Sequence, residues 1–247
     1  LQTVQLKNLD ATLKSTEALL YRPADNGVAY LGKIKDRDLL KTMEGDGRYT
    51  YALIDSNYVI ASQWQGFSQR DLYVIDNNTG KNKLIQKNIK VSQLSPSYDG
   101  QSLVYYVEDQ KKYKSYNAVS GVTKNILTDI PSALYDEEND VPDDPNAYGI
   151  AKWMQDNQHF LVYDRYDIWL GDAEGKSPSV KLTNGRQNKI SYRFVETDND
   201  RQYLNGDAVI LLRTFNEVDK SEGLVSLSLG TRKLFTMNQL PMHLTTI

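Results

Sequence analysis

The stretch SQLSPSYDGQSLVYYVEDQKKYKSYNAVSGVTKNILT, residues Ser92–Thr128, decides the fold class of this chain. Turn-forming residues at Pro96–Gly100 and the Ser120-Gly121 dipeptide divide it into short segments of strand-favouring residues. The predicted strands are Ser92–Ser95, Ser102–Val107, Tyr113–Val119 and Lys124–Leu127. Four antiparallel strands in one repeat are typical of one blade of a β-propeller.

The same pattern occurs four times along the chain. In each repeat an alternating strand leads into a tight turn with glycine and then into a basic, apolar strand. The turn glycines are Gly80, Gly121, Gly175 and Gly230, at intervals of roughly 40 to 55 residues. The sequence therefore predicts an all-β protein, a β-propeller of about four complete four-stranded blades plus partial units.

The other three repeats also divide into four strands each. Before the central repeat the predicted strands are Tyr49–Ile54, Tyr58–Trp64, Asp71–Asp76 and Lys83–Gln86. After it they are Ile150–Met154, Phe160–Asp164, Asp167–Gly171 and Val180–Thr183, then Tyr192–Glu196, Ala208–Phe215, Leu224–Leu229 and Lys233–Thr236. The second strand is the most apolar in each repeat, which is typical of a strand covered on both faces. A β-sandwich is the alternative, but the recurrence of four-strand groups favours the propeller.

Four repeats occupy residues 47–236, which we expect to be the propeller blades. Residues 1–46 show no clear period; a short helix opened by Asp10 and a strand of an incomplete blade both remain open. Residues 237–247 resemble the start of a further blade. We therefore expect a fragment of a larger propeller, whose open blade edge would favour a homo-oligomer because closure normally removes exposed edges.

Composition excludes several classes of function. The net charge of −3, without any block of basic residues, argues against nucleic acid as a partner. Because cysteine is absent, disulfides, thiolate metal sites and a cysteine nucleophile are excluded. No apolar run reaches the roughly 20 residues of a membrane span. The chain does not begin with a signal-peptide pattern, so we expect such a peptide to be absent or removed.

The common catalytic motifs are missing. No Gly-x-Ser-x-Gly pentapeptide occurs, and the nearest candidates, GFSQR at Gly66 and VSGVT at Val119, lack the flanking glycine. His159 and His243 are expected to be packing or surface residues rather than part of a metal site. Without a phosphate-binding or dinucleotide motif, we predict no catalytic residue, no metal ligand and no cofactor.

A long acidic segment, Asp129–Gly149, interrupts the repeats. Loops of this length in compact domains are usually functional or mobile. Its polar cluster is Tyr135, Asp136, Glu137, Glu138, Asn139, Asp140, Asp143 and Asp144. A solvated acidic loop is the favoured interpretation; a Ca²⁺ site and a site for a cationic ligand, such as a peptide amino terminus, are the alternatives.

An aromatic set could line a groove for carbohydrate or peptide, but packing between blades explains it better. Its members are Trp64, Phe67, Tyr105, Tyr106, Tyr163, Tyr166 and Trp169. Most of them alternate within predicted strands, which places them between neighbouring sheets.

Three segments resemble a known family. They are VIASQWQGFSQRDLYVIDNNTG, SPSYDGQSLVYY and YDRYDIWLGDAEGKSPSVKLTNG. Together with the insertion LYDEENDVPDDPNAYG they resemble the N-terminal propeller of prolyl oligopeptidase family serine peptidases, in particular dipeptidyl peptidase relatives from Bacteroidetes. The resemblance covers roughly residues 49–247, and its S-P-x-x-D-G-x-x-L-x-Y element is shared with TolB-like propellers.

The resemblance implies a propeller that caps an α/β-hydrolase domain of the same parent chain and restricts access to peptide substrates. In dipeptidyl peptidases a glutamate pair after an aromatic residue binds the free amino terminus of the substrate. Glu137 and Glu138 match that pair in part, since Asp136 intervenes after Tyr135. We expect a periplasmic or extracellular, non-catalytic propeller fragment of such a peptidase; the alternative is a free-standing TolB-like propeller that binds a protein partner.

Overall fold

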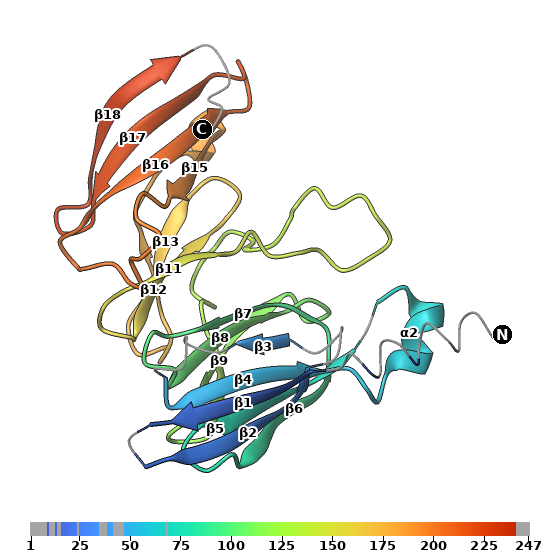
Figure 1. Ribbon diagram of the computed structural model, residues 1–247. Coiled ribbons are helices and arrows are strands. Elements are labelled where there is room, and N and C mark those ends of the chain that lie inside the picture. The colour runs from blue at the N-terminus through green and yellow to red at the C-terminus, as the bar shows by residue number, and fades with distance from the viewer. Residues whose placement is uncertain are drawn as a thin grey trace. The chain divides into compact units, whose positions relative to one another are not determined.

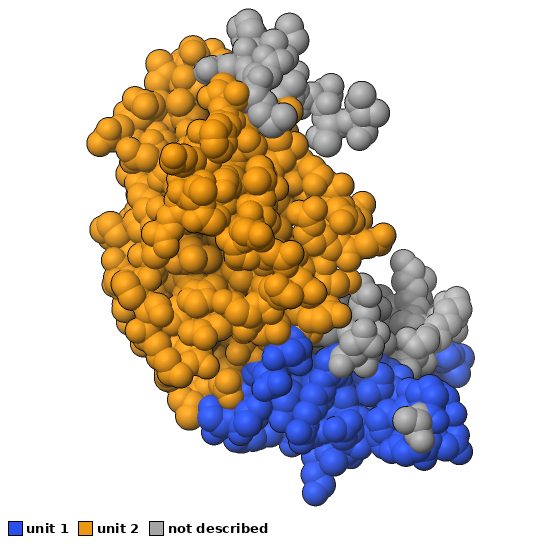
Figure 2. Space-filling view, turned by 90° about the vertical axis from the view of Figure 1, so that its left-hand side faces the viewer, with its two compact units in different colours: residues 1–91, 99–101, 118–121 blue, residues 92–98, 102–117, 122–247 orange. Residues whose placement is uncertain are grey.

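The computed structural model describes residues 16–23, 25–34, 39–41, 47–67 and 69–240, together with Leu9 and Leu13. The chain divides into two compact units (Figure 2). The first holds residues 1–91, 99–101 and 118–121, and the second holds residues 92–98, 102–117 and 122–247.

The described residues form an all-β fold of antiparallel sheets (Figure 1). A hairpin joins β1 (Thr16–Arg22) to β2 (Gly27–Ile34), and the next sheet has the order β3 (Leu39–Lys41), β4 (Tyr49–Ile54), β5 (Arg70–Asp76), β6 (Asn82–Ile89). A second four-stranded sheet contains β7 (Val91–Pro96), β8 (Ser102–Val107), β9 (Lys112–Asn117) and β10 (Val122–Asn125). A third contains β11 (Ile150–Trp153), β12 (His159–Tyr163), β13 (Ile168–Asp172) and β14 (Val180–Lys181). The fourth contains β15 (Ile190–Val195), β16 (Val209–Asn216), β17 (Glu222–Ser228) and β18 (Lys233–Leu240).

The strands predicted for the last three repeats are confirmed, with bounds shifted by a few residues. The first repeat contains an error. The segment predicted as strand Tyr58–Trp64 is a helix, α2 (Val59–Gln65), none of whose residues is buried. Short apolar runs do not distinguish a buried strand from a helix, and β3, outside the predicted repeat, supplies the missing strand.

Local contacts explain why this segment is helical. The Tyr58 hydroxyl donates to the buried carboxylate of Asp71 over 2.6 Å, which fixes the start of the segment. Gly66, at φ 76°, ends α2 in the left-handed region that glycine adopts without strain. Trp64, which we expected to pack between sheets, is 85% exposed.

The two ends of the chain lie partly outside the described residues. Within segment 1–46, the described part includes the β1–β2 hairpin and β3. Residues 237–240, which we expected to begin a further blade, extend β18 and pair with β17. Residues 241–247, with His243, lie outside the described residues.

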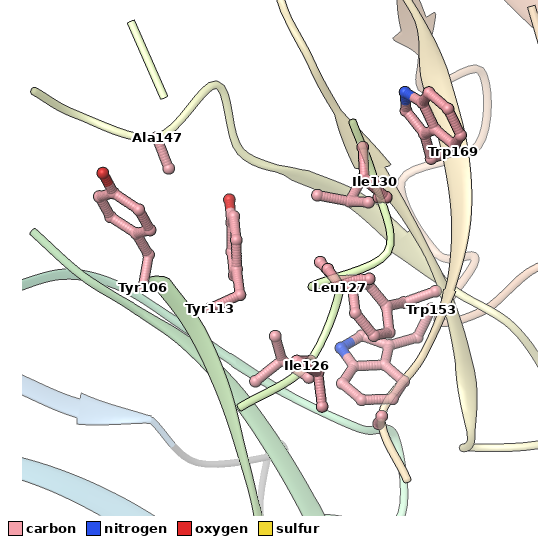
Figure 3. Packing of buried hydrophobic residues seen from close by; sticks show 12 residues of the cluster. Tyr106, Tyr113, Ile126, Leu127, Ile130, Ala147, Trp153 and Trp169 are labelled. Atoms are coloured by element: carbon pink, nitrogen blue, oxygen red, sulfur yellow. The ribbon is translucent and has the colours of Figure 1, made fainter. Parts of the chain in front are cut away.

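The second unit has two buried apolar clusters. One is formed by residues of β8, β9 and β11–β13 together with residues that follow β10, and it includes Tyr106, Ile126 and Trp153 (Figure 3). The other joins the β11–β14 sheet to the β15–β18 sheet. Strand β12 serves both, because Phe160 and Val162 belong to the first cluster and Leu161 and Tyr163 to the second. Side chains alternate across a strand, so the predicted coverage of this strand on both faces is confirmed.

In the third and fourth sheets the strands are antiparallel, so their connections lie at the two opposite ends of the strands. We call each such end an edge. The β12–β13 and β16–β17 turns lie at the edge where the segment 129–149 joins β11; we call this the insertion edge. The β11–β12 and β17–β18 turns lie at the other end of the same strands; we call this the opposite edge. The insertion itself runs out as a long yellow-green loop in Figure 1.

Candidate functional site

The site at the insertion edge is built on a tight turn, Asp164-Arg165-Tyr166-Asp167. The backbone N–H of Asp164 donates to the carbonyl of Asp167 over 3.0 Å, which closes the β12–β13 hairpin. Oδ1 of Asp164 accepts the N–H groups of Tyr166 and Asp167 over 2.8 and 2.7 Å. This is the local bonding by which aspartate favours turns. It places Arg165 and Tyr166 at the tip of the turn.

Both aspartates of this turn are fully buried. Oδ2 of Asp164 accepts the Ser132 hydroxyl over 2.6 Å and the Trp169 indole N–H over 3.0 Å. Asp167 accepts the Thr183 hydroxyl over 2.9 Å, and the Lys181 ammonium lies 2.9 Å from its Oδ2. Burial alone would raise the pKa of Asp164, but the hydrogen bonds from Ser132 and the turn hold that pKa below its usual value.

Arg165 connects three elements at the insertion edge. Its guanidinium donates to both carboxylate oxygens of Glu217, in the β16–β17 turn, over 3.0 to 3.2 Å. A second ion pair joins its Nη1 to Oε1 of Glu138 over 2.5 Å. The Tyr166 hydroxyl donates to Glu217 over 2.8 Å. Although burial opposes it, the bonds from Tyr166 and Arg165 hold the pKa of Glu217 below its usual value.

The two predicted site residues, Glu137 and Glu138, lie side by side on the insertion and pair with different arginines. Glu137 binds Arg186, at the start of the short 3₁₀ helix Arg186–Asn188, over 3.1 Å. Arg165 and Arg186 both lie over the ring of Tyr166, at 5.1 and 5.2 Å from its centroid. We call Glu137, Glu138, Arg165, Tyr166, Arg186 and Glu217 the arginine–glutamate cluster.

Further contacts within the segment fold the insertion. Tyr135 and Ala147 form an isolated antiparallel bridge, and the Tyr148 hydroxyl accepts the backbone N–H of Glu137 over 3.0 Å. The Asn139 side chain donates to the carbonyls of Val141 and Asp143. The segment is therefore held to its own base and to the β12–β13 turn.

The insertion does not form a metal site among the described residues, where no three acidic or histidine side chains are placed to share an ion. Four acidic residues, Asp136, Glu137, Asp143 and Asp144, border a depression of about 430 Å³. Glu137 is already bound to Arg186. The Ca²⁺ hypothesis therefore gains no support from this arrangement.

A groove of about 700 Å³ opens beside the arginine–glutamate cluster. Tyr166 and Phe215 supply aromatic surface, and its charged lining comprises Glu138, Arg165, Lys189, Glu217 and Lys220. Glu138 is 69% exposed in its side chain, and only its Oε1 is engaged by Arg165. Chemically, the cluster clamps the insertion to the sheets and offers a carboxylate that can exchange one cation for another.

Sequence reasoning found the two glutamates but missed their partners. Tyr166 was placed in the packing set and is indeed buried, while Arg165, Arg186 and Glu217 were not singled out. Arg165 carried a usable signal, because it lies between two aspartates in a turn and is therefore at the tip. His159, expected at the surface or in packing, bonds Asp156 at the opposite edge over 2.7 Å.

No family model and no curated protein matches this sequence. Within the described residues, no helix is long and apolar enough to cross a membrane.

Solved structures provide a likeness of fold. A putative dipeptidyl aminopeptidase IV from Bacteroides ovatus matches with a TM-score of 0.50 and 13% identity over 89% of this chain and 39% of that chain. Dipeptidyl peptidase 4 from Porphyromonas gingivalis matches with a TM-score of 0.50 and 13% identity over 79% of this chain and 31% of that chain. A putative TolB from Agrobacterium tumefaciens matches with a TM-score of 0.43 and 15% identity over 91% of this chain and 80% of that chain.

At these identities the likeness shows the fold alone. It supports a propeller fold for the series of four-stranded antiparallel sheets. The matched region is well under half the length of either dipeptidyl peptidase chain.

Proposed function

We propose that this chain is a non-catalytic propeller fragment of a secreted prolyl oligopeptidase-like serine peptidase, in which it gates and positions peptide substrates. The proposed partners are an α/β-hydrolase domain of the same parent chain, a peptide substrate and a second copy across an open blade edge. The proposed location is the periplasm or the cell exterior, which fractionation of the source cells tests.

One observation carries this proposal. Glu138 presents an exposed carboxylate at the mouth of a groove whose lining includes Tyr166 and Phe215. Glu137 is the residue before it in the chain. A peptide ammonium would bind the Oε2 of Glu138 that Arg165 leaves free, while the ring of Phe215 would pack against the first side chains of the peptide. Arg165 and Arg186 keep the two glutamates in place before the peptide arrives, which lowers the cost of ordering them on binding.

Calorimetric titration of the chain with a short peptide such as Ala-Pro-Leu amide, and with the same peptide acetylated at its amino terminus, tests the amino-terminal site. We expect the free peptide to bind and the acetylated one to bind at least about tenfold more weakly, since acetylation removes the charge. Glu138→Gln should weaken the binding of the free peptide by a similar factor. Glu174→Gln, which alters a partly exposed glutamate paired with Lys176 elsewhere in the second unit, is the matched control.

Equal binding of the free and acetylated peptides would exclude the amino-terminal site. The non-catalytic role has a separate test, in which the chain is incubated with aminoacyl and dipeptidyl chromogenic substrates. We expect no release of the chromophore, and robust turnover would overturn the assignment of catalysis to another domain.

A free-standing TolB-like propeller that binds a protein partner is the second candidate. It is favoured by α2 of the first unit, where Ile60 and Trp64 are 78% and 85% exposed, whereas the other two tryptophans, Trp153 and Trp169, are buried. Sequencing the gene beyond Ile247 separates the two candidates. A downstream Gly-x-Ser-x-Gly segment supports the peptidase, whereas a frame that ends there supports the binding module.

A further inference from the structure

A second concave site lies at the opposite edge of the third and fourth sheets, away from the arginine–glutamate cluster. It is a pocket of about 290 Å³ between the β11–β12 and β17–β18 turns. Its apolar wall consists of Met154, Leu170, Leu182 and Leu229. All four belong to, or pack against, the cluster that joins the two sheets. The pocket therefore lies between these turns and reaches the packed core beneath them.

Three polar side chains complete the lining: Asp156, His159 and Arg232. The Asp156 carboxylate accepts the backbone N–H groups of Gln158 and His159 over 3.0 and 2.9 Å, and it lies 2.7 Å from Nδ1 of His159. These bonds stabilise the negative charge of Asp156 and orient the imidazole of His159. Since Nδ1 is engaged, Nε2 is the ring atom of His159 that remains for a ligand.

Arg232 is the unusual member of this lining. Every other described arginine donates to a carbonyl or pairs with a carboxylate of a described residue, whereas Arg232 does neither with any of them. A guanidinium that lies beside an apolar pocket and pairs with no carboxylate of the described residues favours a carboxylate that arrives from outside.

We propose that this pocket binds a small amphiphilic carboxylate, with its compact apolar body against Met154 and the leucines and its carboxylate on Arg232. Water occupies about 30 Å³ per molecule, so the volume suits a body of roughly ten non-hydrogen atoms. Two sources share this chemistry: a free short-chain branched acid, and the carboxyl-terminal apolar residue of a peptide. This site is independent of the proposed function, because no residue of the arginine–glutamate cluster lines it.

Matched neutral and charged probes test the proposal on the full chain. The probes are 4-methylpentanoate, its amide 4-methylpentanamide and N-acetyl-leucine, titrated while backbone amide resonances are followed by NMR. We expect 4-methylpentanoate to bind with a Kd of about 1 mM, in keeping with its few atoms, and to shift amides of the β11–β12 and β17–β18 turns. The amide should bind at least about tenfold more weakly. Tighter binding of N-acetyl-leucine would identify a peptide terminus as the source, and weaker binding a free acid.

Two variants locate the ligand. Arg232→Gln removes the charge and should weaken the acid about tenfold while leaving the weak binding of the amide unchanged. Gly206 lines the pocket, and the Cβ of a residue there would meet no atom within 4 Å. Gly206→Leu should therefore fill part of the pocket without strain and weaken the binding of both the acid and the amide. Arg201→Gln, at the same edge and paired with Asp198, is the control that should bind as the parent does.

Equal binding of the acid and its amide, or unchanged binding in Arg232→Gln, would overturn the proposal. So would the absence of any amide shift in these turns at about 10 mM probe. Glu138→Gln should leave the binding of all three probes unchanged. The proposed carboxylate site is tested by Arg232→Gln and the proposed amino-terminal site by Glu138→Gln, so failure of one proposal is distinguishable from failure of the other.

Discussion

The Asp164–Asp167 turn and the acidic insertion lie at the same edge of the third sheet, and both are rich in carboxylates. They stabilise those carboxylates in opposite ways. Asp164 and Asp167 are fully buried and accept hydrogen bonds from backbone N–H groups and from neighbouring hydroxyl and indole groups, and Asp167 also forms an ion pair with Lys181. Glu137 and Glu138 extend from a loop and are held by Arg186 and Arg165.

The difference separates a structural role from one that is open to exchange. A buried carboxylate that accepts several hydrogen bonds is costly to disturb, since its donors would lose their acceptor in a medium without water. An exposed carboxylate on a guanidinium is screened by solvent, so one cation can replace another at little cost. The turn therefore fixes the position of Arg165, and the insertion provides the groups available to a ligand.

The largest expected effect is that of Asp164→Ala. The substitution leaves the N–H groups of Tyr166 and Asp167, the Ser132 hydroxyl and the Trp169 indole without their acceptor. We expect the free energy of unfolding, measured by urea denaturation, to fall by about 3 kcal/mol. Asp140→Ala, in the exposed part of the insertion, is the control and should change it by less than about 0.5 kcal/mol. A loss below about 1 kcal/mol for Asp164→Ala would contradict the structural role of the turn.

A smaller effect is expected in the pH dependence of stability. The folded-state pKa of Asp164 lies below its unfolded value near 3.9, so the unfolded chain binds the proton more tightly. The stabilisation from this carboxylate is therefore fully present above about pH 4 and is lost as the pH falls through the folded-state pKa. Urea denaturation at several pH values should show the stability gap between the parent and Asp164→Asn narrowing below about pH 4. A gap of constant size down to pH 3 would show that ionisation of Asp164 contributes nothing.

Arg165→Gln tests the link between the two regions. It removes the ion pairs to Glu138 and Glu217, of which the second is only partly exposed, so we expect a loss of about 1 kcal/mol. Hydrogen exchange should also become faster for amides of residues 135–148, because the insertion loses one of its two arginine anchors. Lys176→Gln, which breaks an exposed pair with Glu174, should leave the exchange of that segment unchanged. Unaltered exchange in Arg165→Gln would mean that the arginine does not hold the insertion.

The smallest effect is expected for Glu138→Gln. Its carboxylate is mostly exposed, and the glutamine still offers one oxygen to Arg165, so the free energy of unfolding should change by less than about 0.5 kcal/mol. Denaturation of this variant beside Asp164→Ala gives the comparison directly. If the two variants cost the same, the distinction between the turn and the insertion fails.

Local sequence signals predicted most of the strands. Turn residues such as Pro96–Gly100 and apolar segments such as Ser102–Val107 act over a few neighbours, so their effect is visible without the fold. The same signals failed at Val59–Gln65, where the apolar residues face solvent and the polar contact of Tyr58 with Asp71 decides the conformation. Tyr58 precedes the helix and Asp71 follows it, so a search for hydrophobic periodicity within the segment does not detect their contact.

The candidate site shows the same division. Glu137 and Glu138 were visible as a cluster of charge, but the partners that define their chemistry lie about 30 to 80 residues further along the chain. Likewise, the pocket at the opposite edge combines His159 with Arg232, two residues that no motif connects.

The sequence by itself determined that this is an all-β chain of repeated four-stranded units with an acidic insertion, because turn chemistry and side-chain alternation are local properties of the backbone. Which carboxylates are buried and which are exposed depends on the packing of the folded chain. That packing also brought Arg165 between Glu138 and Glu217 and left Arg232 without a partner among the described residues. These outcomes depend on the register and packing of neighbouring sheets, which bring distant residues together and set how much water reaches each charge.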